Sequence, residues 1–263
     1  MNSLYKMYIY YFISQQTNTM QTTKNTILIT GGTSGIGLAF AKEFVRLKNT
    51  VIICGRRENR LTTIKEKFPD VIIKVCDITN TTEREALASW VLENYPDINV
   101  LINNAGIELK TDLTHKIDLD KVRTEVETNF IAPVHLTSLF AQHLASKNEA
   151  AVINISSGLA FTPMAALAVY CATKAAIHSI TLSLRYQLRN TSVKVFEIAP
   201  PAVDTELGYQ DRHESGQTHG GIPAQVFIKG AMEAIINDEF EAAIDTAKHL
   251  REKREEMFAM LNH

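Results

Sequence analysis

The sequence predicts a doubly wound α/β fold, in which one parallel sheet carries helices on both faces. Three observations support this: six short, almost continuously apolar runs, helical periodicity between them, and no break in composition along the chain. Continuous apolar runs are typical of strands that are covered on both faces. Right-handed crossovers between parallel strands then place helices on either side of one sheet. We therefore expect a single α/β domain.

The elements follow in order along the chain. The expected strands are the apolar runs at residues 26–30, 51–54, 71–75, 99–102, 151–156 and 193–199. The expected helices, which have apolar residues at helical spacing, lie at 36–47, 61–68, 83–95, 122–144 and 169–188. A polar segment rich in Gly and His predicts a substrate loop at about 206–223, and the charged stretch 247–261 predicts a surface helix or a frayed tail.

The first nineteen residues do not fit this pattern. They contain four tyrosines, and their apolar run of about ten residues is short of the roughly 20 that a membrane-spanning helix needs. The polar stretch that follows has no small-residue cleavage site of a secretory signal. We expect residues 1–19 to be a disordered extension and residues 20–263 to form the domain. A segment that binds a membrane surface or a partner is the alternative.

Composition and charge exclude several classes of protein. A chain of 263 residues with 45% hydrophobic residues can bury a sizeable core, which excludes a disordered protein. Its 27 basic and 29 acidic residues give a formal net charge of −2, so we expect no nucleic-acid partner. The three cysteines have no metal-ligand spacing. We therefore expect no metal site and a reducing, cytoplasmic location.

A glycine-rich turn follows the first strand. The run TGGTSGIG ends at Gly37 and opens a helix. Glycines let a backbone approach a pyrophosphate closely, and the free N–H groups of a helix start meet its charge. The structural alternative is a tight strand-to-helix connection, but this position favours a Rossmann-like dinucleotide site. The expected contacts from this turn are Gly31, Thr33, Ser34, Gly35, Ile36 and Gly37.

The end of the second strand indicates which dinucleotide binds. An acidic residue there would accept the ribose hydroxyls of NAD, but this chain has Arg56 and Arg57. A guanidinium can hold a 2′-phosphate through two hydrogen bonds, and no carboxylate repels that phosphate. We expect both arginines to bind NADP(H), with NAD(H) as the second choice of cofactor. The alternative, that they are the solvated start of the next helix, stays open.

Two further turns lie at the carboxyl edge of the expected sheet, where the ligands of open α/β folds bind. Asp77 and Ile78 follow the third strand, and Asp77 either accepts from an adenine amino group or caps the following turn. Asn104, Ala105 and Gly106 follow the fourth strand as a small-residue turn. We expect all five residues to contact the cofactor.

A serine, a tyrosine and a lysine follow the fifth strand. Ser157 comes directly after it, and Tyr170 and Lys174 are four residues apart, so they share one face of the next expected helix. A nearby cation favours the phenolate of a tyrosine, so we expect Lys174 to lower the pKa of Tyr170 toward neutrality. Taken singly, each residue has a structural alternative as a strand end or as part of the core.

The order of TGGTSGIG, NNAG, Asn129, Ser157, the Tyr-x-x-x-Lys pair and PPAVDT resembles the short-chain dehydrogenase/reductase family over nearly all of residues 26–245. The resemblance implies that Tyr170 exchanges the substrate proton and that Ser157 hydrogen-bonds the reacting oxygen. It further implies that Lys174 holds the nicotinamide ribose and that Asn129 connects a water relay to it. Asn129 could instead bond a buried backbone group.

Four runs, CGRRE, VLINNAGI, SSGLAF and IAPPAVDTEL, resemble the DltE-type oxidoreductases within that family. One position departs from the family pattern, because Pro201 stands where glycine is usual after Pro200. Proline removes an N–H and restricts φ, so the backbone beside the nicotinamide is expected to differ. Val203 and Thr205 still occupy positions that contact the cofactor in the family.

The resemblance implies an NADP(H)-dependent oxidoreductase that interconverts a carbonyl and an alcohol. Leu159, Phe161 and Met164 are expected to line an apolar substrate pocket. The first alternative is an NADP-binding regulatory protein, or a cell-wall accessory protein of lipoteichoic acid D-alanylation, without turnover. The second is a serine hydrolase, although Ser157 lacks the Gly-x-Ser-x-Gly elbow of many hydrolases.

The family commonly assembles through two long helices, which lie here at about 118–146 and 168–189. They carry many small and apolar residues that permit close helix packing. We therefore expect a homodimer or homotetramer. The same faces could equally be covered within one chain.

Overall fold

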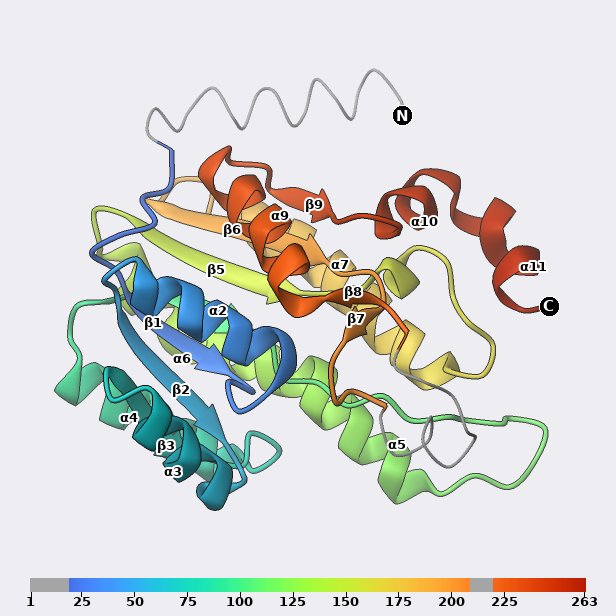
Figure 1. Cartoon of the computed structure of the whole chain (residues 1–263), viewed down its shortest axis with the longest axis horizontal. Coiled ribbons are helices and arrows are strands. Elements are labelled where there is room, and N and C mark those ends of the chain that lie inside the picture. The colour runs from blue at the N-terminus through green and yellow to red at the C-terminus, as the bar shows by residue number, and fades with distance from the viewer. Residues whose placement is uncertain (1–18, 209–219) are drawn as a thin grey trace.

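The computed structural model describes residues 19–208 and 220–263, and its centre is a seven-stranded parallel sheet (Figure 1). The strand order is β3-β2-β1-β4-β5-β6-β9, so the doubly wound parallel sheet is confirmed. The strands are β1 (Thr26–Thr30), β2 (Thr50–Gly55), β3 (Val71–Val75), β4 (Ile98–Asn103), β5 (Ala150–Ile155), β6 (Val193–Ala199) and β9 (Glu241–Ala243). The seventh strand, β9, was not predicted. A separate parallel pair joins β7 (Val203–Asp204) to β8 (Ile222–Pro223).

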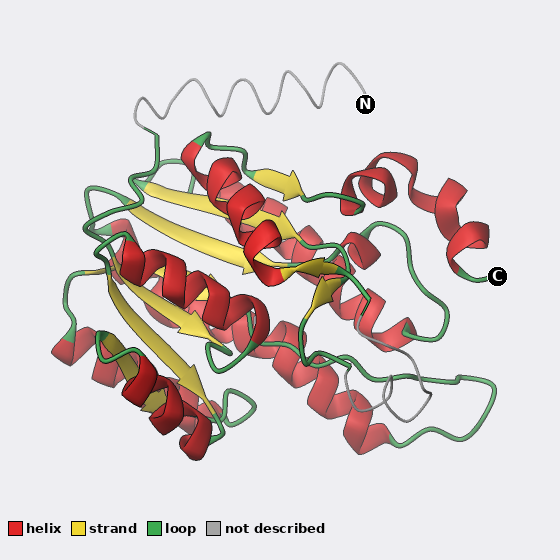
Figure 2. Ribbon diagram, viewed as in Figure 1, coloured by secondary structure: helices red, strands yellow, loops and turns green. Residues whose placement is uncertain are grey.

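Helices cover both faces of the sheet (Figure 2). One layer consists of α2 (Gly35–Arg46), α3 (Glu58–Lys67) and α9 (Ala224–Ile236). The other layer consists of α4 (Thr81–Asn94), α6 (Ala132–Ala145) and α7 (Ala168–Gln187). Alternate residues of each strand feed the two layers: Ile27 and Ile29 face the first, Leu28 faces the second, and all three are fully buried.

The predicted helix at 122–144 is interrupted. It consists of α5 (Leu119–Val126), a π-helical turn η1 (Glu127–Ile131) and then α6. Pro133, in the first turn of α6, has no N–H to donate to the carbonyl of Asn129 four residues earlier, so the α-helical ladder cannot continue through that point. The extra residue of the π turn accommodates this break.

A buried arginine ties the π turn to its neighbours. The Arg84 side chain on α4 is only 2% exposed, and it donates to the Glu127 carboxylate at 2.6 Å and to His135 Nδ1 at 3.0 Å. It also donates to the Thr81 hydroxyl and the Ile78 carbonyl. One side chain therefore joins α4, the π turn, α6 and the loop after β3.

The predicted helix at 247–261 is broken into α10 (Ala247–Lys253), a 3-10 turn η3 (Arg254–Met257) and α11 (Phe258–Leu261). Met20, where the predicted domain begins, is buried against the core. The predicted extension 1–19 lies outside the described residues except for Thr19, and the loop predicted at 206–223 is described only at its two ends. Within the described ranges, no helix has both the length and the apolar character to cross a membrane.

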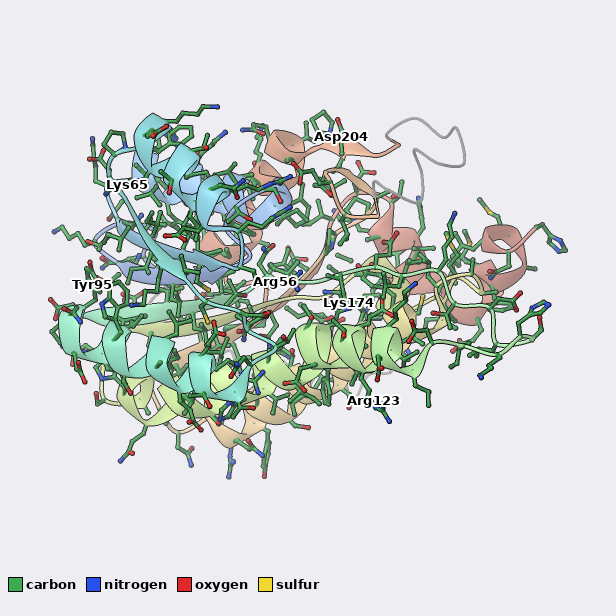
Figure 3. The ribbon with its side chains drawn as sticks, turned by 90° about the horizontal axis from the view of Figure 1, so that it is seen from below. Arg56, Lys65, Tyr95, Arg123, Lys174 and Asp204 are labelled. Carbon is green, nitrogen blue, oxygen red and sulfur yellow. The ribbon has the colours of Figure 1, made fainter. Side chains whose placement is uncertain are left out.

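Replacing Arg84 with Met should destabilise the protein by about 3 kcal/mol, because the carboxylate of Glu127 and three other acceptors lose their donor. Urea denaturation followed by circular dichroism measures this change. The matched control is Arg123→Met on α5, whose side chain is exposed (Figure 3) and should cost about 0.5 kcal/mol at most. Equal losses in the two variants would contradict the role of Arg84.

Candidate active site

A cavity of about 460 Å³ opens at the carboxyl edge of the sheet, where the turns after β1 to β4 meet α7. Arg56 and Lys174, labelled in Figure 3, both line it. Most of the predicted cofactor and catalytic residues are brought together there. Those that line the cavity are Gly31, Thr33, Ser34, Gly35, Ile36, Arg56, Arg57, Asp77, Ile78, Asn104, Ala105, Gly106, Tyr170, Lys174 and Thr205.

The glycine-rich turn leaves no room for side chains. Gly31 has a positive φ of 66°, and a Cβ there would lie 2.8 Å from the Ala105 Cα. A Cβ on Gly37 would lie 2.5 Å from the Gly31 carbonyl oxygen, so this glycine supports the turn from behind and does not line the cavity. The Asn104 amide donates to the Thr30 carbonyl at 2.9 Å, which holds the turn against the end of β4.

The start of α2 points polar backbone at the cavity. Ser34, the residue before the helix, has an extended conformation, and its side chain makes no capping hydrogen bond. The first-turn N–H groups of a helix have no partner inside the helix, and the helix dipole adds a partial positive charge there. Because Gly35 and Ile36 line the cavity, this end of the helix could hold an anionic group such as a pyrophosphate.

The two arginines after β2 have different surroundings. Arg57 donates to the Thr33 hydroxyl at 3.4 Å and lies 3.8 Å from the Glu206 carboxylate, which also pairs with Arg60. Arg56 is exposed, and it has no ion pair with another described residue. Glu206, which the sequence analysis did not single out, therefore offsets part of the positive charge at this end of the cavity.

Asp77 lines the cavity and also closes a turn. Its Oδ1 accepts from the Thr79 backbone N–H at 3.0 Å and from the Thr79 hydroxyl at 2.8 Å. The capping alternative considered for Asp77 is therefore present in the structure. Its neighbour Ile78 is buried and contributes an apolar wall at the same end of the cavity.

Tyr170 and Lys174 lie one turn apart on α7, and both are buried. The Lys174 ammonium donates to the Ile155 carbonyl at 2.9 Å and lies 5.7 Å from the centre of the Tyr170 ring. Ser157 is buried at the end of β5, and its hydroxyl oxygen accepts from the Leu159 N–H at 3.1 Å. Ser157 does not line the cavity directly, whereas its neighbour Ser156 does.

The pKa of Tyr170 was predicted to be lowered, but the residues around it raise it. Burial raises the pKa of Tyr170 above its ordinary value, the charge of Glu108 adds to this, and a hydrogen bond with Ser157 opposes it. Burial also lowers the pKa of Lys174 to about 8. Burial is the largest of these effects on Tyr170, so the surroundings keep its hydroxyl protonated.

Asn129 lies in the π turn and is buried behind the cavity wall without lining it. Its Oδ1 accepts from the Ile107 N–H at 2.8 Å, and its Nδ2 donates to the Ile107 carbonyl at 2.8 Å and to the Thr173 hydroxyl at 3.2 Å. The backbone-bonding alternative considered for Asn129 is therefore present. A Cβ on Gly106 would lie 3.4 Å from Asn129 Oδ1 and 3.7 Å from Lys174 Nζ, so Gly106 packs closely against both side chains.

Three residues expected to form an apolar pocket do not line this cavity. The centre of the Phe161 ring lies 4.9 Å from the centre of the His178 ring, and Phe161 packs among alanines of β6, β9 and α10. Leu159 and Met164 pack against a small cluster that contains Tyr170. Val203, predicted to contact the cofactor, is buried in β7 outside the cavity lining.

Sequence reasoning missed several residues of the cavity wall. Glu108 and Leu109 follow the NNAG turn directly, so their place after a strand end was a signal that could have identified them. Thr128 carried no such signal, because a helix interior does not indicate a cavity. Glu206, Leu207 and Gly208 also line the cavity, and they lie at the start of the substrate loop predicted at about 206–223. The unpredicted lining residues are Gly55, Cys76, Thr79, Ile107, Glu108, Leu109, Thr128, Ile155, Ser156 and Pro200.

Comparison with known sequences gives a consistent family. Residues 25–216 match the family model described as short chain dehydrogenase. The chain is 46% identical, over 89% of its length and 93% of the relative's, to the uncharacterized oxidoreductase DltE of Bacillus subtilis (strain 168). It is 32% identical to the NADP-dependent 3-hydroxy acid dehydrogenase YdfG of Escherichia coli (strain K12), over 67% of this chain and 72% of that protein.

Solved structures share the fold. A short chain dehydrogenase/reductase from Burkholderia phymatum in complex with NAD superposes with a TM-score of 0.82 and 22% identity, over 93% of this chain and 97% of that one. The closed form of a serine dehydrogenase complexed with NADP+ superposes with a TM-score of 0.75 and 26% identity, over 83% of this chain and 94% of that one.

Proposed function

The chain belongs to the short chain dehydrogenase family, and from that membership we propose that it is an NADP(H)-dependent oxidoreductase that interconverts a carbonyl and an alcohol. The proposal rests on one observation: residues that fit a dinucleotide and residues that fit proton transfer line the same cavity. A glycine-rich helix start fits a dinucleotide, and the Tyr170 and Lys174 side chains fit proton transfer.

The cavity fits a nicotinamide dinucleotide. The tight glycine turn depends on Gly31 and Gly37, where a side chain would clash with Ala105 or with the turn itself, and the first turn of α2 borders the cavity beside it. In the proposal, the first turn of α2 holds the pyrophosphate, Asp77 and Ile78 flank the adenine, and Lys174 holds the nicotinamide ribose. Thr205 and the turn Asn104–Gly106 complete this binding site.

Arg56 is the proposed ligand of the 2′-phosphate, with Arg57 beside it. Both line the cavity at the end of β2, and Arg56 has no competing ion pair within the described part of the chain. The NADP-dependent name of the YdfG relative and the NADP+ complex of the serine dehydrogenase support the same preference. NAD(H) remains the second choice, since the Burkholderia phymatum neighbour is in complex with NAD.

In the proposed chemistry, the bound cofactor supplies or accepts the hydride. Tyr170 gives its proton to the oxygen of the reduced substrate, and Ser157 donates a hydrogen bond to that oxygen because its own acceptor role is met by the Leu159 N–H. Lys174 keeps its positive charge beside the tyrosine, which stabilises the phenolate that proton donation leaves. Asn129 orders the backbone behind Lys174. A protonated Tyr170 is the form needed for carbonyl reduction.

Replacing Tyr170 with Phe should lower kcat for carbonyl reduction by at least about a hundredfold, because the proton donor is lost. NADPH binding, measured by fluorescence titration, should stay close to that of the unaltered protein. A carbonyl screen read by NADPH absorbance measures turnover. The matched control is Tyr186→Phe at the exposed end of the same helix, which should keep full activity. Undiminished turnover by the Tyr170 variant would refute the assignment.

Replacing Arg56 with Ala should raise KM for NADPH by about tenfold and leave KM for NADH nearly unchanged, because only NADPH carries the 2′-phosphate. Steady-state kinetics with each cofactor gives the ratio of KM for NADPH to KM for NADH. Arg46→Ala, an exposed arginine at the other end of α2, serves as the control and should alter neither constant. Equal effects on the two cofactors would show that Arg56 acts by another route.

We also propose a homodimer or homotetramer that assembles through α7. Ala132 and Leu136, in the first of the two helices that were predicted to form the subunit contact, are fully buried within the chain. The exposed face of α7 does carry small residues that allow close packing with a second helix, and these are Ala172, Ala175, Ser179 and Ser183.

Light scattering coupled to gel filtration should give a multiple of the chain mass for the unaltered protein and a smaller particle for Ala175→Arg. The added charge and bulk would prevent close helix packing. Ala86→Arg, an exposed alanine on α4, should keep the original mass. A monomer in the unaltered protein would reject the proposal.

A further inference from the structure

The wall of the cavity after β4 is a short segment, residues 107–111, that is anchored at every second residue. The N–H groups of Ile107, Leu109 and Thr111 donate to three different acceptors at 2.8–2.9 Å. Alternate anchoring is the pattern of extended backbone, in which successive N–H groups point to opposite sides. The segment is therefore fastened along its outer edge, while Glu108 lines the cavity.

The middle anchor is a carboxylate inside the protein. Asn129 holds the first N–H, and the carbonyl of Ala166 holds the last. The middle one, on Leu109, donates to Glu125 Oε1 at 2.9 Å. Glu125 lies on α5, four residues before Asn129, and is fully buried. Two residues of one helical stretch thus hold the first and the middle points of the cavity wall.

Glu125 is an unusual residue for this position. A buried carboxylate is costly unless hydrogen bonds and charges compensate it. Its second oxygen, Oε2, is buried with no hydrogen-bond partner among the described residues. Burial raises the pKa of Glu125 to about 7, and the nearby negative charge of Glu108 adds to this, while the Leu109 N–H opposes it. Glu125 thus changes its charge near neutral pH.

The groups that face Glu125 belong to the proposed reaction. From the cavity wall the titratable neighbour is Glu108, and from α7, which packs against α5, the neighbours are Tyr170 and Cys171. Cys171 is buried and contacts the Met164 backbone. The ionised Glu125 raises the pKa of Tyr170 through its charge. No cation among the described residues pairs with Glu125.

We propose that Glu125 is a positioning residue, whose carboxylate holds the Leu109 edge of the cavity wall and places a negative charge on the Tyr170 side of α5. The inference rests on the proposed carbonyl–alcohol chemistry. Above neutral pH the charge of the ionised Glu125 adds to burial and to the charge of Glu108, which keep the proton on Tyr170 and favour carbonyl reduction. Below neutral pH Glu125 is protonated and this effect is lost. The second anchor of the wall then becomes a weaker, neutral hydrogen bond.

The test separates the charge of Glu125 from its hydrogen bond. Glu125→Gln keeps an oxygen that can accept from Leu109 and removes the charge, whereas Glu125→Leu removes both. In both variants the basic limb of the pH profile for carbonyl kcat/KM should move to lower pH by about half a unit. Only Glu125→Leu should also raise KM for the carbonyl, by roughly tenfold. KM for NADPH should change little in either variant.

The control is Asp120→Asn on the same helix, which removes one exposed negative charge and should leave the pH profile in place. If the profiles of Glu125→Gln and the unaltered protein coincide, the charge of Glu125 does not act on Tyr170. If Glu125→Leu retains the original KM for the carbonyl, the anchor at Leu109 does not shape the site. Either result overturns the corresponding half of the proposal.

A second measurement needs no turnover. The pKa of Glu125 is higher in the folded protein than in the unfolded chain. Protonated Glu125 therefore stabilises the fold at low pH, and this contribution to the free energy of unfolding is lost as the pH rises through about 7. The melting temperature of Glu125→Gln, relative to the unaltered protein, should therefore rise by about 3 °C between roughly pH 5 and pH 8. If the difference in melting temperature stays constant with pH, Glu125 does not titrate in this range and that part of the proposal is overturned. If the difference in melting temperature rises but no carbonyl is turned over, the proposed carbonyl chemistry is refuted and the titration of Glu125 is not.

Discussion

Parallel pairing of the strands is the constraint on which the rest of this structure depends. It brings the ends of β1, β2, β4 and β5 to one edge, so turns that are far apart in sequence meet around a single cavity. The closeness of the Gly31 turn to Ala105 follows from the adjacency of β1 and β4. In the same way, the pairing of β4 with β5 places the Ile155 carbonyl, which holds Lys174, next to the turn after β4.

Several charged side chains lie inside the protein. Arg84, Glu125 and Lys174 are each almost fully buried, and each bonds to backbone groups that belong to other elements. A buried charge is tolerated only where donors and acceptors surround it, so these residues locate their partners more strictly than apolar packing would. Apolar contacts hold the sheet and its helices together, and buried charges arrange the loops and the π turn at its edge.

Much of the fold and of the candidate site could be predicted from the sequence, since the apolar runs and the glycine turn depend on local patterns. The π turn could not, because the residues around Asn129 keep helical spacing and only Pro133 hinted at the break. Glu125 was missed because a glutamate on an amphipathic helix normally faces solvent. The raised pKa of Tyr170 was not predicted, because the closeness of Lys174 can be anticipated from spacing whereas the degree of burial cannot. The short β9 lacked a long apolar run.

The small size of β9 has a consequence for the chain as it is synthesised. From β4 onward each new strand joins the same edge of the sheet, in the order β4, β5, β6 and β9. Until β9 arrives, the partly made protein presents the long β6 as an open edge that could pair with another nascent chain. The final strand has three residues, so the edge of the finished sheet offers few unpaired backbone groups to another chain. The last strand of the sheet to be made is therefore the one that protects this edge from pairing with another chain.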